Sequence, residues 1–148
     1  MQPLVDIVIR HPRERKSKCS LEPLRHRDDI RFLVFRPDLS FDASGLVLLS
    51  IDAPVIGESD GEWPLLLLDS TWRLLPAMRR AITGSFRIRS LPPGIRTAYP
   101  RSSKISPDPP AGLASVEALY LARRLQGRPT SGILDAYRWR ESFLRQFG

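Results

Sequence analysis

An acid and an indole follow directly on a run of leucines in LLLLDSTW, residues 65–72. A short apolar run bounded by polar residues is typical of a strand buried on both faces, as in parallel sheets. Ligands of open α/β sheets bind at the carboxyl ends of the strands, so Asp69 and Trp72 predict a site for a flat, charged small molecule. In the alternative interpretation, Asp69, Ser70 or Thr71 caps the next helix and Trp72 belongs to the core.

Residues that commonly bind metals are scarce in the sequence. The one cysteine is Cys19, and the two histidines are His11 and His26. This composition excludes an internal disulfide, a cysteine-cluster metal site and a histidine-rich metal centre. We therefore expect chemistry without a metal.

The length of 148 residues, with 42% hydrophobic residues, suits one domain with a proper core. The first twenty residues carry five Lys/Arg and no long apolar run, so we expect no signal peptide. The longest apolar runs are far shorter than a membrane span. These features predict a cytoplasmic protein without a membrane partner.

The net charge of +7 is distributed in blocks along the chain. Residues 10–27 hold seven Lys/Arg, residues 38–69 hold seven acids and no Lys or Arg, and residues 73–104 hold eight Lys/Arg and no acid. Such an uneven distribution of charge favours a polyanion, most simply nucleic acid, as the partner. The alternative is a basic protein whose charges are simply solvated.

The elements that must position these residues follow from the hydrophobic pattern. Apolar runs predict strands at residues 5–9, 30–35, 46–50, 65–69 and 86–91. Helical spacing predicts helices at residues 73–82, 113–125 and 130–147, and Ser20 could cap a short helix through Arg27. Pro76 falls in or near the first turn of its helix, where proline is tolerated. The sequence therefore predicts an α/β domain with a mostly parallel sheet.

A proline-rich stretch, residues 92–112, interrupts this pattern. It could be a disordered linker, but a long ordered loop inside a compact domain is usually functional. Its cations lie beside an aromatic residue, a mixture that holds phosphates and stacks on bases. The candidate RNA-binding residues are Arg96, Tyr99, Arg101 and Lys104.

Four motifs occur in a recognisable order: KCSLEPL (18–24), LLLLDSTW (65–72), GLASVEAL (112–119) and YRWRESFL (137–144). Together they resemble the superfamily of 18S rRNA aminocarboxypropyltransferases and DTW-domain tRNA aminocarboxypropyltransferases. DSTW is similar to the D-x-[ST]-W signature of the DTW group, and GLASVEAL to the GL-[ST]-x-EA stretch of both groups. The first and last motifs resemble the ribosomal family, with Arg140 where glycine is usual. TAYPRSS (97–103) resembles the Tyr–Arg segment of DTW proteins.

The resemblance implies a SPOUT-like α/β fold with flanking helices and a C-terminal trefoil knot. It implies one domain over residues 1–148, with a basic N-terminal segment at 10–27 and a catalytic core at 46–148. It further implies a monomer that uses S-adenosylmethionine (SAM) as donor substrate, without metal. The 3-amino-3-carboxypropyl (acp) group of SAM would pass to a uridine or modified uridine in RNA, with rRNA favoured over tRNA.

The resemblance also assigns roles to single residues. Asp69 could act as general base or orient the uracil ring. The implied SAM-binding positions are Ser20, Leu49, Ile51, Trp72, Leu91 and Ser115. Ser20 and Ser115 match hydroxyls that hold the methionine carboxylate, and Ser115 would lie at a helix N-terminus, which favours anions. The apolar positions would surround ribose and adenine, and ordinary core packing is the alternative for them.

Two other functions remain open at this point. A SPOUT-like RNA methyltransferase would release S-adenosylhomocysteine, whereas an acp transferase releases methylthioadenosine. A non-catalytic RNA-binding protein of the same fold would not bind SAM tightly.

Overall fold

The computed structural model describes residues 4–13, 20–71, 73–99 and 113–147. Its main feature is a five-stranded sheet with the strand order β2-β1-β5-β4-β7, in which every neighbouring pair is parallel. The strands are β1 (Asp6–Arg10), β2 (Ile30–Val34), β4 (Val47–Leu49), β5 (Leu65–Asp69) and β7 (Arg87–Arg89). The mostly parallel α/β sheet predicted from the apolar runs is confirmed.

The leucines of β5 lie between two hydrophobic clusters, which explains why the sequence shows no alternation there. Leu65 and Leu67 pack in one cluster with Leu119, and Leu66 packs in the other with Met78. Both faces of the central strand are therefore covered, as the unbroken apolar run requires.

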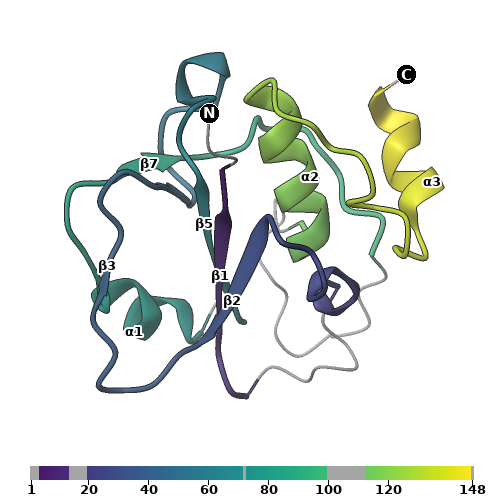
Figure 1. Cartoon of the computed structure of the whole chain (residues 1–148). Helices are drawn as coiled ribbons and strands as arrows, with labels where there is room; N and C mark the ends of the chain where they lie inside the picture. Colours follow the sequence, from purple (N-terminus) through teal and green to yellow (C-terminus); the bar gives the residue numbers. More distant parts are fainter. Residues whose placement is uncertain (1–3, 14–19, 72, 100–112, 148) are drawn as a thin grey trace.

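Helices cover the two faces of the sheet, as Figure 1 shows. Helix α1 (Leu75–Arg80) lies on one side, and α2 (Ser115–Leu125) and α3 (Arg140–Leu144) lie on the other. A small parallel pair, β3 (Phe41–Asp42) and β6 (Ile82–Thr83), lies on the α1 side. Single turns of 3-10 helix complete the elements: η2 (Glu22–Leu24), η3 (Glu58–Asp60) and η4 (Arg145–Phe147).

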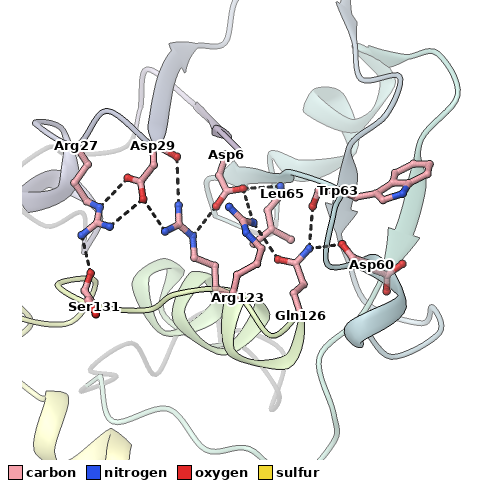
Figure 2. Close-up of polar contacts among 10 residues, drawn as sticks. Asp6, Arg27, Asp29, Asp60, Trp63, Leu65, Arg123, Gln126 and Ser131 are labelled. Atoms are coloured by element: carbon pink, nitrogen blue, oxygen red, sulfur yellow. Dashed lines mark hydrogen bonds and ion pairs between the residues drawn. The ribbon is translucent and has the colours of Figure 1, made fainter. Parts of the chain in front are cut away.

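The C-terminal end of α2 is fixed to the amino ends of the strands by a network of ion pairs (Figure 2). Asp6, at the start of β1, is fully buried and pairs with Arg123 at 2.7 Å and Arg128 at 2.8 Å. Asp29, just before β2, pairs with Arg123 and Arg27, each at 2.9 Å. Helix α2 therefore runs antiparallel to the strands, and its N-terminus lies at their carboxyl edge.

Three expectations about helices differ from the structure. Helix α1 begins after Leu74 without a side-chain cap, so neither Asp69 nor Ser70 nor Thr71 caps it. The predicted helix over residues 130–147 is helical at α3 and η4, whereas residues 131–136 form turns. Gly132 has a φ of +81°, which an α-helix cannot accommodate. Similarly, the helix predicted from Ser20 to Arg27 is the single turn η2.

The predicted trefoil knot stays a prediction, because residues 100–112 lie outside the described part of the chain. Within the residues that the structure describes, no helix has the length and apolar character needed to cross a membrane.

Candidate functional site

The carboxyl ends of the parallel strands bring several predicted residues to one edge of the sheet. Arg10 and Asp69 are register partners at the ends of β1 and β5. Strand β4 ends beside them at Leu49, and β7 ends at Arg89. In open α/β sheets this edge is where ligands bind.

Asp69 is buried at this edge, with 4% of its surface exposed. Its Oδ1 accepts a hydrogen bond from Ser115 Oγ at 2.8 Å. Its Oδ2 lies 3.4 Å from Arg10 Nε. A buried carboxylate held in this way is oriented, and a carboxylate is one of the side-chain groups that can serve as a general base. The contacts with Ser115 and Arg10 replace the helix-capping role that was the alternative for Asp69.

Two predicted serines meet at the N-terminus of α2. Ser115 is the first residue of this helix, and Ser20 Oγ accepts a hydrogen bond from the backbone N–H of Val116 at 3.1 Å. Hydroxyl groups beside the positive end of a helix dipole suit an anionic group such as a carboxylate. The structure thus brings Ser20, Ser115 and Asp69 together from three segments that are distant in sequence.

Glu117 fixes the same helix end from its other side, and the sequence reasoning gave it no role in the site. Its carboxylate is fully buried and accepts hydrogen bonds from Thr97 Oγ1 at 2.6 Å, Ala98 N at 2.8 Å and Tyr137 Oη at 2.9 Å. Burial and the negative charge of Glu117 raise the pKa of Tyr137, so this hydroxyl remains a donor. The sequence did contain a signal for this role, because the motif GLASVEAL places its glutamate in the first turn of α2.

Ile51 projects into solvent on the turn that follows β4. Its side chain is 66% exposed, and the next residue, Asp52, has a φ of +54° in the left-handed region. Ser90 holds the following residues in place, because its Oγ donates to the carbonyl of Ala53 at 2.6 Å. An apolar side chain on a fixed turn at this edge could form one wall of a ligand site.

Leu49 and Leu91 are partly buried and pack on the hydrophobic cluster beneath α2. Their contacts fit core packing, which was the alternative for these residues, and also place them along the same edge. Their role as SAM-binding residues stays a prediction. Trp72 lies outside the described residues, so its predicted packing on SAM stays a prediction as well.

The described part of the proline-rich loop packs against the C-terminal region. Arg96 is exposed, and its backbone N–H and carbonyl bond to the side chain of Gln146 at 2.8 and 2.7 Å. Tyr99 contacts Trp139 edge to face, with 5.0 Å between ring centroids. Arg101 and Lys104 lie outside the described residues.

Other kinds of site are not built from the described residues that the sequence singled out. Across the described ranges, no group of three or more His, Cys, Asp or Glu residues could hold a metal ion. A shallow groove of about 600 Å³ opens near α3, and none of the predicted site residues lines it. The serine, aspartate and arginine side chains at the carboxyl edge therefore form the candidate site.

No protein-family model and no curated protein matches the sequence. A solved structure does match, that of the SAM-dependent rRNA:acp-transferase Tsr3 from Vulcanisaeta distributa. The identity is 22%, the match covers 99% of this chain and 79% of that chain, and the TM-score is 0.69. At this identity the likeness shows a shared fold. It agrees with the family that the sequence motifs resemble.

Proposed function

We propose that this protein transfers the acp group of SAM to a ring nitrogen of a uridine or modified uridine in RNA, with rRNA favoured over tRNA. The observation that carries the proposal is the meeting of Asp69, Ser115 and Ser20 at the carboxyl edge of the sheet. The fold is shared with a protein described as a SAM-dependent rRNA:acp-transferase, which supports the choice of reaction.

Asp69 has the central role in the proposed reaction. A uracil ring N–H is a weak acid, and it must lose its proton before the nitrogen can attack carbon. Asp69 accepts this proton or holds the ring N–H by a hydrogen bond during attack. The new bond joins the ring nitrogen to the terminal carbon of the acp group. The carbon–sulfur bond breaks, and its electron pair converts the sulfonium into the neutral thioether of methylthioadenosine.

We propose that the N-terminus of α2, with Ser20 and Ser115 beside it, selects the part of SAM that is transferred. All three carbons bonded to the sulfonium are activated, so the pose of the molecule decides which one reacts. Holding the methionine carboxylate at the N-terminus of α2 places the acp chain near Asp69. We propose Ile51, Leu49, Leu91 and Trp72 as the apolar surroundings of the nucleoside.

The products distinguish this function from its alternatives. Purified protein is incubated with SAM and either rRNA or tRNA, and the small-molecule products are separated by chromatography. Release of methylthioadenosine is expected. Release of S-adenosylhomocysteine would instead identify a methyltransferase, and release of neither would favour a non-catalytic RNA-binding protein.

The target RNA requires a second measurement. We favour rRNA because the first and last motifs resemble the ribosomal family and because the protein of shared fold is described as acting on rRNA. Mass spectrometry of nucleosides from rRNA and tRNA of a deletion strain would show which RNA loses an acp-modified uridine. Loss from tRNA alone would contradict the choice of rRNA.

A further inference from the structure

The groove of about 600 Å³ near α3 has lining side chains that suit a nucleic acid strand. It is lined by Tyr120 from α2, by residues of the segment 130–135, and by Arg140, Glu141 and Arg145. We propose that this α2–α3 groove binds single-stranded RNA, with Arg140 and Arg145 contacting phosphates and Glu141 accepting hydrogen bonds from ribose hydroxyl groups. The inference rests on the proposed function, and it extends the RNA contact to residues to which the sequence reasoning gave no role.

The groove lies further along the helix that begins at the candidate site. Ser115, the first residue of α2, contacts Asp69 at the carboxyl edge of the sheet, and Tyr120 follows in the same helix. At about 1.5 Å of rise per residue, Tyr120 lies about 7–8 Å further along the helix axis. Sites for single strands commonly cover about 4–16 nucleotides. One strand can therefore place its target uridine at Asp69 and its neighbouring nucleotides in the groove.

The cations that line the groove are accessible. Arg140 and Arg145 are both exposed. Arg140 Nη1 lies 3.6 Å from Asp135 Oδ1, and the two side chains are 46% and 77% exposed. An ion pair so open to solvent stabilises a protein little, so a phosphate can replace Asp135 as the partner of Arg140. Guanidinium groups suit phosphates because they can donate two parallel hydrogen bonds to one group.

Tyr120 places an aromatic ring beside these cations. Its ring lies edge to face with that of Phe143, with 6.2 Å between the centroids, and its hydroxyl accepts a hydrogen bond from Arg124 at 3.2 Å. The exposed guanidinium of Arg124 also lies over the Phe147 ring, 4.9 Å from the centroid. Proteins that bind single strands combine arginines with aromatic rings in this way, because phosphates meet the cations and bases meet the rings.

Acidic side chains in the groove favour RNA over a simple polyanion. Asp135 and Glu141 line the groove together with Thr130 and Ser131. A carboxylate repels a phosphate, but it accepts hydrogen bonds from a ligand that carries donors as well as negative charge. The 2′-hydroxyl of ribose is such a donor, and DNA lacks it. The combination of arginines and carboxylates therefore fits a strand of RNA.

The first test measures the affinity for a labelled single-stranded RNA of about twelve nucleotides, by fluorescence anisotropy over a salt series. The double variant Arg140→Gln/Arg145→Gln should bind this RNA about tenfold more weakly. The slope of log affinity against log salt should fall by about 1.4, since each phosphate contact to a single strand contributes about 0.7. Urea unfolding should show wild-type stability, because both arginines are exposed.

Arg31→Gln/Arg80→Gln is the matched control, because it removes the same charge from the other side of the sheet. Both arginines are exposed. Arg80 belongs to α1, and Arg31 shares a face of β2 with Leu33, which packs in the cluster on the α1 side. Figure 1 shows α1 on the opposite side of the sheet from α2 and α3. The proposal is overturned if both double variants bind RNA with the same affinity and salt slope.

The second test compares the RNA with DNA of the same base sequence. The wild type should bind the RNA about threefold or more tightly. Glu141→Ala should reduce this preference, because the carboxylate no longer accepts a hydrogen bond from ribose. Glu62→Ala, at an exposed acid outside the groove, is the control and should keep the preference. A preference that is unchanged in Glu141→Ala would contradict the proposed contact with ribose.

The groove and the proposed reaction can fail separately, because RNA binding is measured without turnover. If no RNA yields methylthioadenosine but Arg140→Gln/Arg145→Gln still weakens RNA binding relative to its control, the reaction is wrong and the groove is an RNA site. If methylthioadenosine is released and the double variant binds RNA like its control, the reaction stands and the groove proposal is wrong.

Discussion

At the scale of single residues, Asp69 is the side chain on which the proposed chemistry depends. The isosteric change Asp69→Asn keeps the shape of the side chain and removes its capacity to accept a proton. We expect the rate of methylthioadenosine release to fall about a hundredfold or more, with SAM affinity by calorimetry little changed. Asp38→Asn, at an exposed residue outside the site, is the control and should be neutral. Equal losses of rate and SAM affinity in Asp69→Asn would assign Asp69 to binding instead.

Ile51 offers a second test at this scale. Because its side chain is exposed, replacing it can affect ligand binding with little effect on stability. If SAM covers this side chain, Ile51→Ser should weaken SAM binding about fivefold to tenfold, from the apolar area that is no longer buried. The free energy of unfolding should change little. Val34→Ser is a matched control, since Val34 is 61% exposed on β2. Similar SAM affinities for both variants would remove Ile51 from the site.

The residues of the site differ in how far the sequence could predict them. The motifs predicted three residues of the site: Asp69, Ser20 and Ser115. In the structure Ser115 contacts Asp69, and Ser20 contacts the N-terminus of the helix that Ser115 begins. Arg10 was counted as one of many cations in a basic segment. Its burial depends on its register with Asp69, and pairing between strands that are distant in the chain cannot be deduced from local sequence.

At the scale of elements, the network beneath α2 predicts a pH dependence of stability. A hydrogen bond from Arg27, followed by one from Arg123, lowers the pKa of Asp29 from its usual value of 3.8. Because the pKa of Asp29 is lower in the folded state than in the unfolded state, ionised Asp29 stabilises the fold at pH values above its unfolded-state pKa. This stabilisation is lost as the pH falls towards and through its folded-state pKa. The stabilisation should therefore be complete near neutral pH and decline in acid below about pH 4.

Asp29→Asn tests this contribution. The variant should be about 1.5–3 kcal/mol less stable than the wild type at neutral pH, the usual value for hydrogen bonds to charged groups. Urea unfolding at about pH 7 and about pH 3 should show the difference shrinking in acid. Asp28→Asn, at the exposed neighbouring residue, is the control and should leave the free energy of unfolding nearly unchanged at both pH values. A difference independent of pH would show that the ion pairs of Asp29 do not stabilise the fold.

The elements themselves were predicted unequally well, for identifiable reasons. Continuous apolar runs such as the one ending at Asp69 require burial on both faces, and the strands of the five-stranded sheet were found within one or two residues. The short parallel pair β3 and β6 was not predicted. The segment 130–147 has apolar residues at helical spacing. In the structure, however, Leu134 and Tyr137 lie in consecutive turns, which bury their side chains without a helix. A turn can bury the same side chains as a helix, and hydrophobic spacing alone does not distinguish them.

At the scale of the whole molecule, the fold class followed from the order of strands and helices. The asymmetric charge predicts a polyanion as the partner, and RNA is the polyanion in the function that we propose. The path of the chain through the predicted knot depends on contacts between distant segments, so pattern reasoning alone could not have suggested it.

The charge of the whole molecule leads to a prediction about RNA binding. Each phosphate contact contributes roughly one unit to the slope of log affinity against log salt. Replacing Arg96, Arg101 and Lys104 by alanine should therefore weaken RNA binding and reduce this slope by about three, measured by fluorescence anisotropy over a salt series. Gln146 fixes the backbone at Arg96 and leaves its side chain exposed beside α3, in a suitable position to meet RNA. Arg80→Ala, on α1 across the sheet, is the control and should leave the slope unchanged. An unchanged slope in the triple variant, with the fold intact, would place the RNA along the basic segment from Arg13 to Arg27.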